Sequence, residues 1–350
     1  MEEKSVTLIN FIKRINIMIK IAVLGCGRIG QMHARNVSNH PDTSLAAVYD
    51  TNKEFGERIA NELNVPLVND DKKIFEDNNI DAILIASPTA THIEFIEKSV
   101  ASNKPVYCEK PIDLNISKVN ECAKRLQGNT VPIHLGFNRR FDPGHVATRD
   151  AMISGEIGDL HQVIITSRDP GLPSMEYYKE AGGLLRDMTI HDFDIARFML
   201  QEDPAKVFAI ANALEEPKLK SELNDFDTVM VVMETKSGKQ CHINNSRSSK
   251  YGYDQRIELV GNKGMVLSDN KKINNVKKYS ANGENTSTVE HFFLERYHDA
   301  FMNGLTSFAL CIKNKTMPDV GFEDGRKALL LAEAAYESLK THQMVNVNYD

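Results

Sequence analysis

The chain has 350 residues, of which 41% are hydrophobic and 26% charged, and its formal net charge is -6. Because one hydrophobic core seldom serves more than ~250–300 residues, this length predicts two domains. A slightly acidic chain without a basic stripe lacks the usual footprint of a nucleic-acid or anionic-membrane binder, so neither partner is expected. The five cysteines stand singly, with no CxxC pair, so we expect no metal site, no disulfide framework and a cytoplasmic location.

The first seventeen residues differ in pattern from the rest of the chain. Lys13 and Arg14 interrupt their apolar run, and acidic residues stand where a secretory signal would be basic. We therefore expect residues 1–17 to be an N-terminal extension and the first domain to begin at Met18. No apolar run approaches the ~20 residues of a membrane span.

Strands and helices alternate through the first half of the chain. Continuous apolar runs predict buried parallel strands at 19–24, 43–50, 81–88, 105–112 and from 131 onward. The segments between them predict helices from about 29, at 52–64, 91–103 and 116–129. This alternation predicts an α/β fold, a doubly wound parallel sheet of the Rossmann type, over residues 18–137.

The second half, residues 138–350, changes to period-two patterns. Strands are expected within 160–169, 227–249, 255–269 and 274–281, with turns at Ser237-Gly238 and Asn262-Lys263-Gly264. Helices are expected at 187–201, about 291–313 and 323–341. We predict an α+β domain with a mostly antiparallel open sheet, serving substrate binding and oligomerisation. An uncovered sheet face would expose apolar side chains, which favours a homo-oligomer.

A glycine-rich turn directly follows the first strand. Gly25-Cys26-Gly27-Arg28-Ile29-Gly30 has the spacing G-x-G-x-x-G between a strand and a helix. In this motif the first glycine permits a tight turn, the second lets a pyrophosphate approach the backbone, and the third lets the helix pack on the strand. The helix N-terminus then meets the phosphate, so the turn predicts a dinucleotide site.

The end of the second strand indicates which dinucleotide binds. Asp50 lies twenty residues after Gly30, where a carboxylate bonds the ribose hydroxyls and repels a 2′-phosphate. NAD is therefore favoured over NADP, although Lys53 nearby is a counter-signal that leaves NADP open.

Two more segments follow parallel strands, at the edge of the sheet where ligands bind. They are "SPTATH" (87–92) and "EKP" (109–111). The expected cofactor contacts are Gly25, Gly27, Arg28, Ile29, Gly30, Asp50, Ser87, Thr89, His92, Glu109 and Lys110.

An apolar segment of the second half carries an unusual number of ionisable groups. It reads "GGLLRDMTIHDFDIARFML" (182–200) and includes Asp187, His191, Asp192 and Asp194. Such groups are costly to bury unless they are paired or used. Asp187 and His191 are spaced i,i+4, so on one helix they would share a face.

The motifs taken together resemble a known family. "GCGRIG", "SPTATH", "CEKP", "GFNRRFD" and "GGLLRDMTIHDFDIARF" are similar to those of the glucose–fructose oxidoreductase / inositol dehydrogenase / rhizopine catabolism (Gfo/Idh/MocA) family. The resemblance covers the chain after Met18, and "KYGYDQRIELVGNKGM" and "FFLERYHDAF" resemble the inositol 2-dehydrogenases within it. It implies a homotetramer assembled through the second domain's sheet.

The resemblance also implies roles for three residues. The lysine of the E-K-P motif falls on Lys110, which would touch the reacting hydroxyl, and the Lys110-Pro111 bond is commonly cis in the family. The D-x-x-x-H motif falls on Asp187, which would support the substrate and position the histidine, and on His191, which would take the hydroxyl proton. These residue types suit alcohol oxidation without a metal, because a histidine is a base near neutral pH and a lysine stabilises an alkoxide.

The substrate is predicted to be a polyol, with contacts from Lys110, Arg139, Asp169, Asp187, His191 and Tyr253. The leading prediction is oxidation of myo-inositol to 2-keto-myo-inositol by an NAD-dependent inositol 2-dehydrogenase. Phe301 stands where some inositol dehydrogenases carry a tyrosine, so another inositol isomer (scyllo- or chiro-) or a pyranose stays open. A non-catalytic NAD-binding regulator is the other alternative.

Overall fold

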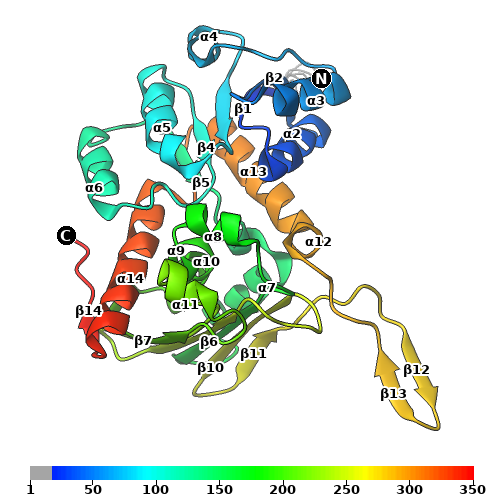
Figure 1. The fold of residues 1–350 in the computed structure, drawn as a ribbon, viewed down its shortest axis with the longest axis vertical. Helices are drawn as coiled ribbons and strands as arrows, with labels where there is room; N and C mark the ends of the chain where they lie inside the picture. Colours follow the sequence, from blue (N-terminus) through cyan, green and yellow to red (C-terminus); the bar gives the residue numbers. More distant parts are fainter. Residues whose placement is uncertain (1–17) are drawn as a thin grey trace, which may run out of the picture. The chain divides into compact units, whose positions relative to one another are not determined.

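The computed structural model describes residues 18–350, so the expected N-terminal extension, residues 1–17, lies outside the described residues. Two compact units make up the described chain (Figure 1). The first runs to Glu109 and also includes Lys124–Gly136 and Leu305–Gly321. The second comprises Lys110–Ala123, Phe137–Gly304 and Phe322–Asp350.

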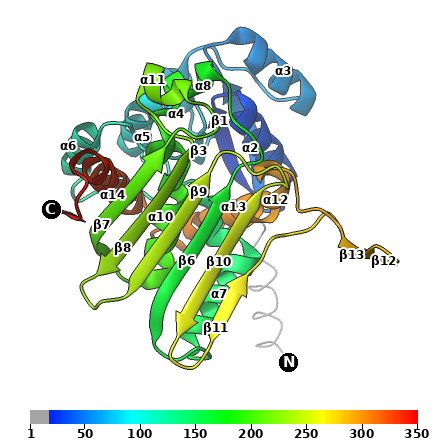
Figure 2. The same cartoon turned by 60° about the horizontal axis from the view of Figure 1, so that its bottom comes forward.

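The second unit is built on a seven-stranded sheet with strand order β11-β10-β6-β9-β8-β7-β14 (Figure 2). Its strands are β6 (Leu160–Arg168), β7 (Pro204–Asn212), β8 (Thr228–Thr235), β9 (Gln240–Ser246), β10 (Asp254–Gly261), β11 (Met265–Ser268) and β14 (Val345–Asn346). Every neighbouring pair is antiparallel except β6 and β9, which confirms the predicted mostly antiparallel sheet. Strand β7 was not among the expected strands.

Helices cover one face of this sheet. Helix α10 packs on β6 and β9, α14 on β7, and α7 on β10 and β11. The helical elements from Asn138 onward are η2 (Asn138–Phe141), α7 (Pro143–Ile153), α8 (Met175–Ala181), α9 (Leu184–Asp187), α10 (Thr189–Leu200), α11 (Lys218–Leu223), α12 (Phe293–Arg296), α13 (His298–Asn314) and α14 (Phe322–Thr341). From Leu305 onward, α13 belongs to the first unit. The side chains of Ile210, Met230 and Val232 on β7 and β8 are exposed, and Ile210 pairs with Met230 across the two strands.

Two expected helices are divided in the structure. The predicted helix 187–201 is wrong at its start, because α9 ends at Asp187 and α10 begins at Thr189. The predicted helix at about 291–313 is interrupted after Arg296 and becomes α12 and α13. Beyond β11, a two-stranded ribbon of β12 (Lys277–Ser280) and β13 (Gly283–Thr286) stands away from the rest of the second unit (Figure 1).

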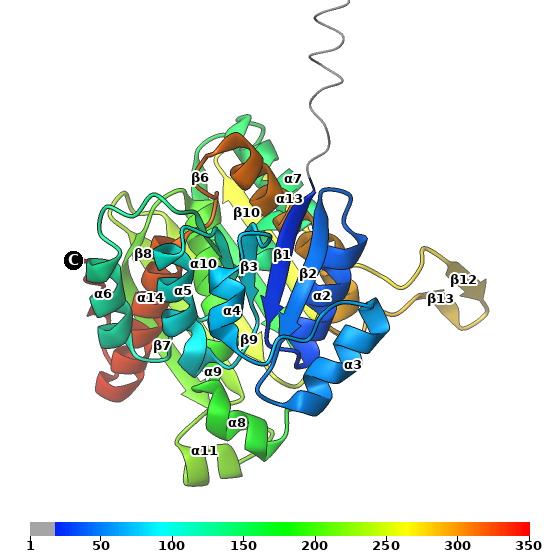
Figure 3. The same cartoon turned by 90° about the horizontal axis from the view of Figure 1, so that it is seen from above.

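The first unit contains a five-stranded sheet with order β2-β1-β3-β4-β5, and Figure 3 shows β1, β2 and β3 side by side. All its strands pair in parallel, as predicted. They are β1 (Ile19–Leu24), β2 (Thr43–Tyr49), β3 (Ala82–Ile85), β4 (Val106–Cys108) and β5 (Ile133–Leu135). The helices between these strands in the chain are α2 (Arg28–Asn39), α3 (Lys53–Leu63), α4 (Asp71–Glu76), η1 (Thr89–Thr91), α5 (His92–Ala101) and α6 (Ile116–Arg125). Helix α6 belongs to the second unit up to Ala123.

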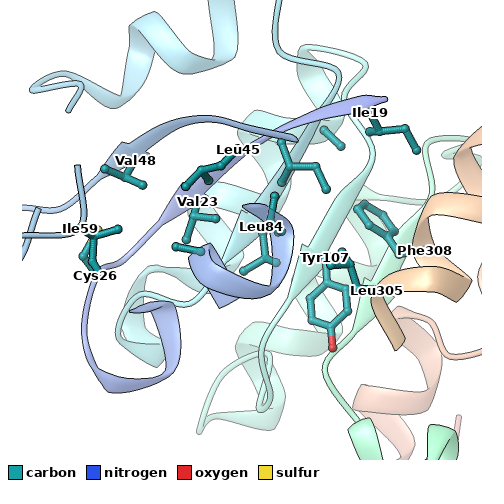
Figure 4. Packing of buried hydrophobic residues seen from close by; sticks show 14 of the residues in the cluster. Ile19, Val23, Cys26, Leu45, Val48, Ile59, Leu84, Tyr107, Leu305 and Phe308 are labelled. Atoms are coloured by element: carbon teal, nitrogen blue, oxygen red, sulfur yellow. The ribbon is translucent and has the colours of Figure 1, made fainter. Parts of the chain in front are cut away.

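The core of the first unit forms where the apolar runs of these strands meet their helices (Figure 4). Val23, Leu84 and Phe308 are completely buried in it. Continuous burial along a strand is what a parallel sheet covered by helices requires. Helix α3 begins where the Asn52 side chain accepts hydrogen bonds from Glu54 N–H and Phe55 N–H, which fixes the chain just after β2.

Candidate active site

The three glycines of the turn after β1 have three different surroundings. Gly25 has φ +97°, and a Cβ there would lie 2.5 Å from the Ser87 backbone nitrogen. A Cβ on Gly30 would lie 1.9 Å from the Gly25 carbonyl oxygen, so the first turn of α2 passes directly against β1. A Cβ on Gly27 would meet nothing within 4 Å. The close contacts explain the outer glycines, and the open space at Gly27 is where a pyrophosphate fits.

Asp50 follows β2 and contacts this turn. One carboxylate oxygen accepts the Cys26 N–H at 2.6 Å, and the other accepts the Asn52 N–H at 2.7 Å. Asp50 is therefore held beside the glycine-rich turn, where the ribose of a dinucleotide would lie. The counter-signal, Lys53, pairs with Glu57 at 3.4 Å one helical turn along.

The other expected cofactor residues of this unit gather at the same edge of the sheet. Backbone hydrogen bonds continue the pairing of the strands just beyond their ends: the Ala86 N–H donates to the Leu24 carbonyl, and the Glu109 N–H donates to the Ile85 carbonyl. Polar bonds then fix the loops, including His92 Nε2 with the Ser87 carbonyl at 2.9 Å and Glu109 Oε1 with His33 Nε2 at 2.7 Å. Thr89 opens η1, Arg28 is exposed at the start of α2, and Ile29 is half-buried.

These residues fit a dinucleotide. The open position at Gly27 precedes a twelve-residue helix whose first N–H groups suit a phosphate, and the Asp50 carboxylate suits ribose hydroxyls. The carboxyl ends of parallel strands are the expected location for such a ligand.

A second polar site lies within the second unit. We call it the Asp187 cluster and define it as Lys110, Asp169, Tyr177, Asp187 and Arg247. Lys110 Nζ donates to the Asp187 carbonyl at 2.7 Å and to its Oδ1 at 3.3 Å, and the Tyr177 hydroxyl donates to the same Oδ1 at 3.0 Å. Arg247 donates to Asp187 Oδ2 at 2.5 Å and to Asp169 Oδ2 at 3.1 Å. The Lys110-Pro111 bond is cis.

Asp187 and Asp169 have opposite shifts in pKa. Burial raises the pKa of Asp187, but the positive charges of Lys110 and Arg247 outweigh burial and hold it at about 2. Burial raises the pKa of Asp169 to about 6, because Arg247 compensates only in part and the charge of Asp187 adds to the rise. Asp187 is therefore an anion at neutral pH, whereas Asp169, with a pKa of about 6, titrates just below neutral pH.

His191 lies in the first turns of α10. Burial, followed by the positive charges of Lys110 and Arg139, holds its pKa well below the usual value, so the imidazole is neutral at pH 7. Its Nδ1 is buried without a hydrogen-bond partner, and the ring meets Phe137 edge-on at 6.0 Å. Among residues 18–350 the structure records no hydrogen bond between His191 and Asp187, because the helix is interrupted at Met188 and Asp187 bonds the cluster instead.

The next two acids of α10 are bound to arginines. Asp192 is fully buried and forms an ion pair with Arg139, and it also accepts a bond from Asn245 at 3.0 Å. Asp194 accepts two bonds from Arg140, and its carboxylate lies 4.0 Å from Arg197. Asp194 belongs to the packing of α10 rather than to the Asp187 cluster.

The remaining expected substrate residues are buried nearby. Arg139 is 5% exposed and also donates to Ser167 Oγ at 3.1 Å. Tyr253 packs edge-on against Tyr297 and Phe292, and burial raises the pKa of its hydroxyl well above the usual value. Phe301 is 6% exposed on α13.

Two members of the Asp187 cluster, Tyr177 and Arg247, were not identified from the sequence. Arg247 directly follows β9, in the same way that Asp169 directly follows β6. Because β6 and β9 are parallel neighbours, residues after their ends lie together, with Arg168 opposite Ser246. Knowledge of the pairing between β6 and β9 would have identified Arg247 from the sequence. Nothing in the sequence singles out Tyr177.

Metal-ligand clusters and membrane-spanning helices are both absent from residues 18–350. Within that range no group of three His, Cys, Asp or Glu residues is placed to hold a metal ion. None of the helices in the same range combines the length and apolar character that crossing a bilayer requires. The five cysteines lie within residues 18–350; all are buried and none of them forms a disulfide bond there.

A parallel sheet with open space at Gly27, in the turn after β1, is typical of a dinucleotide-binding protein. A lysine, an ionised aspartate and a neutral histidine are groups that alcohol oxidation uses. The class is thus a dinucleotide-dependent oxidoreductase. The chain belongs to the Gfo/Idh/MocA family: residues 19–137 match its model "Oxidoreductase family, NAD-binding Rossmann fold", and residues 145–267 match its C-terminal domain.

Several known proteins are similar over nearly the whole chain. Inositol 2-dehydrogenase of Rhizobium meliloti is 40% identical over 94% of this chain and 99% of its own length. Myo-inositol 2-dehydrogenase of Thermotoga maritima is 38% identical over 94% of this chain and 98% of its own length. The structure of scyllo-inositol dehydrogenase from Lactobacillus casei with NAD(H) and scyllo-inositol matches with a TM-score of 0.87 and 28% identity, over 94% of this chain and 99% of that one.

Proposed function

We propose that this chain is an NAD-dependent inositol 2-dehydrogenase that oxidises myo-inositol to 2-keto-myo-inositol. The observation that carries the proposal is the charge balance of the second unit's site. Its three cations, Lys110, Arg139 and Arg247, are each bonded to a carboxylate. Such a site offers many hydrogen-bonding groups and no cation without a counter-charge, which suits an uncharged polyol better than an acid or a phosphate. Relatives named inositol 2-dehydrogenase support the choice of polyol.

Three residues carry the reaction in this proposal. Lys110 donates a hydrogen bond to the reacting hydroxyl and stabilises the alkoxide as it forms. His191, neutral because of its burial and its cationic neighbours, takes the hydroxyl proton. Asp187 fixes Lys110 and accepts a bond from the polyol, and its lack of a bond to His191 makes it a partner of the lysine rather than of the base.

NAD, when bound, supplies the nicotinamide ring that accepts the hydride. We propose that it is held by Gly25, Gly27, Arg28, Ile29, Gly30, Asp50, Ser87, Thr89, His92, Glu109 and Lys110. The Asp50 carboxylate disfavours a 2′-phosphate by charge repulsion, so the preference is for NAD over NADP. This assigns residues 18–137 to cofactor binding and 138–350 to substrate binding and oligomerisation.

Arg139, Asp169 and Tyr253 complete the proposed substrate site. Asp169 presents a carboxylate to a ring hydroxyl, while Arg139, fixed by Asp192, and Tyr253 border the same polar region. A site built on hydrogen bonds discriminates strongly, because the wrong isomer leaves buried polar groups unpaired.

Association is proposed to occur through the seven-stranded sheet. Exposed Ile210, Met230 and Val232 give its open face an apolar character that a second copy would cover, and a homotetramer is the proposed assembly. We propose a cytoplasmic location, which suits five cysteines that form no disulfide within the described residues. Light scattering tests the assembly, and a monomer at micromolar concentration would contradict it.

Initial rates with a panel of polyols and both cofactors test the function. The panel contains myo-, scyllo- and chiro-inositol and a pyranose such as glucose, each with NAD and with NADP. The proposal requires the highest kcat/KM with myo-inositol and NAD. Faster oxidation of scyllo-inositol would support the rival that Phe301 and the Lactobacillus casei neighbour suggest. Tight NAD binding without turnover of any polyol would favour a regulator.

A further inference from the structure

Arg247 bonds two carboxylates of the site at once. Its side chain is 5% exposed, and separate guanidinium nitrogens donate to Asp187 Oδ2 at 2.5 Å and to Asp169 Oδ2 at 3.1 Å. Asp169 follows β6 and Asp187 ends α9, so one side chain joins two separate elements. A planar fork of N–H donors is suited to this task, and a lysine ammonium is not.

The backbone around Arg247 is fixed by hydrogen bonds. The Arg247 N–H donates to the Asp227 carbonyl at 2.8 Å. The Asp169 N–H donates to the Ser246 carbonyl at 2.9 Å, and the Ser249 N–H donates to the Asp169 carbonyl at 2.8 Å. The segment 246–249 therefore encloses Asp169, and the guanidinium is positioned before any substrate arrives.

The charges around the two carboxylates show what Arg247 contributes. Asp187 faces the cations Lys110 and Arg247, the neutral Tyr177 hydroxyl, and the carboxylates of Asp169 and Asp225. Asp169 faces the cations Arg247 and Arg139 and the carboxylates of Asp187 and Asp192. Lys110 bonds Asp187 alone and Arg139 bonds Asp192, so Arg247 is the cation that Asp169 and Asp187 share. Without Arg247, Lys110 would still bond Asp187, but Asp169 would lose the cation that bonds it and would still lie near an ionised Asp187. A buried carboxylate in that position holds its proton to higher pH.

We propose that Arg247 is a positioning residue of the polyol site, which holds Asp169 and Asp187 at a fixed separation and keeps both as acceptors for two hydroxyls of one substrate molecule. This inference rests on the proposed function and extends it to a residue outside the family motifs. Substrates that lack one of the two hydroxyls would leave a carboxylate unpaired, so Arg247 acts on specificity through the acids it holds.

Kinetics of Arg247→Met give the first test. The variant should show a KM for myo-inositol at least about ten-fold higher and a smaller change in kcat. The acid limb of kcat/KM should move up by about one pH unit or more, because Asp169 then keeps its proton to higher pH. Arg247→Lys, whose ammonium reaches one carboxylate, should give an intermediate profile. Superimposable pH profiles and an unchanged KM would overturn the proposal.

Thermal unfolding between pH 5 and 8 gives a second test that needs no substrate. The folded pKa of Asp169 is already about 6 in the wild type, above the unfolded value of about 3.9, and Arg247→Met should raise it further, so the variant loses more stability as the pH rises. The difference in Tm between Arg247→Met and the wild type should therefore widen from pH 5 to pH 8. If Arg247→Met does not fold, Arg247→Lys replaces it and should show a smaller widening.

Tyr178→Leu is the matched control for packing. The Tyr178 ring lies 5.4 Å from the Arg247 guanidinium, so its loss removes packing without removing charge, and its Tm gap should be the same at each pH. A gap for Arg247→Met that is equally constant would overturn the proposal. If the wild type oxidises no polyol, the proposed function fails, while a widening Tm difference still shows that Arg247 governs the protonation of Asp169.

Discussion

Alanine at Gly27 and alanine at Gly30 should have opposite effects, although the two glycines belong to one turn. Gly27 has φ -67° and ψ -171°, which alanine adopts without strain, and a methyl group there meets no atom within 4 Å. Gly27→Ala should therefore leave the free energy of unfolding within about 0.5 kcal/mol of the wild type. The same methyl group occupies the space of the pyrophosphate, so the Kd for NAD should rise ten-fold or more, or at least about 1.4 kcal/mol.

Gly30→Ala places its Cβ 1.9 Å from the Gly25 carbonyl oxygen, about 1 Å closer than real Cβ atoms come to backbone. Helix α2 must move off β1, and overpacking of this kind costs about 1–3 kcal/mol, which corresponds to a fall in Tm of roughly 2–12 °C. Thermal unfolding without cofactor and calorimetric titration with NAD separate the two effects. Wild-type NAD affinity in Gly27→Ala would refute the assignment of the open space, and a wild-type Tm in Gly30→Ala would refute the contact.

Three further substitutions test the second unit. In initial-rate assays, Lys110→Met should lower kcat for polyol oxidation by about 10²–10³-fold, and His191→Ala should lower it by about 10²–10⁴-fold. Normal kcat values would contradict the proposed roles of the two residues. Asp192→Ala leaves the buried Arg139 without its carboxylate and should cost about 3–5 kcal/mol in urea unfolding, whereas an unchanged midpoint would refute the pairing. Asp187→Asn should cost about 2 kcal/mol near pH 7, since the pKa of Asp187 is lowered from 3.8 to about 2. A carboxyl whose pKa is lower in the folded state stabilises the protein at pH values above its unfolded pKa. The difference in free energy of unfolding between Asp187→Asn and the wild type should therefore close as the pH falls from about 4 to 2, and a constant difference would contradict the pairing.

Local patterns predicted the first unit closely. Continuous apolar runs indicated the parallel strands, and the G-x-G-x-x-G spacing indicated the turn, because each depends on residues adjacent in the chain. The expected NAD-binding Rossmann fold is confirmed by the sheet and by the family match at residues 19–137. The roles of the individual contact residues remain predictions.

The second unit was predicted less completely because its site is made by pairing between distant segments. The sequence indicated strands within 160–169 and 227–249, but the parallel pairing that brings Asp169 and Arg247 together depends on β6 lying between β10 and β9. The i,i+4 spacing of Asp187 and His191 suggested direct contact, yet the break at Met188 directs Asp187 toward Lys110 and Arg247. Spacing along a helix predicts contact only where the helix is continuous.

The ionisable residues of "GGLLRDMTIHDFDIARFML" divide by whether each has a counter-charge. Asp192 and Asp194 are fixed by arginines from η2, and Asp187 is fixed by Lys110 and Arg247. His191 instead keeps a buried Nδ1 without a hydrogen-bond partner and a pKa held low by burial and by neighbouring cations. Burial and the nearby cations Lys110 and Arg139 keep the imidazole neutral, while the carboxylates balance those cations, so the site carries no excess charge. The acids of this segment therefore balance buried cations around one neutral histidine, which accounts for so many ionisable groups in an apolar segment.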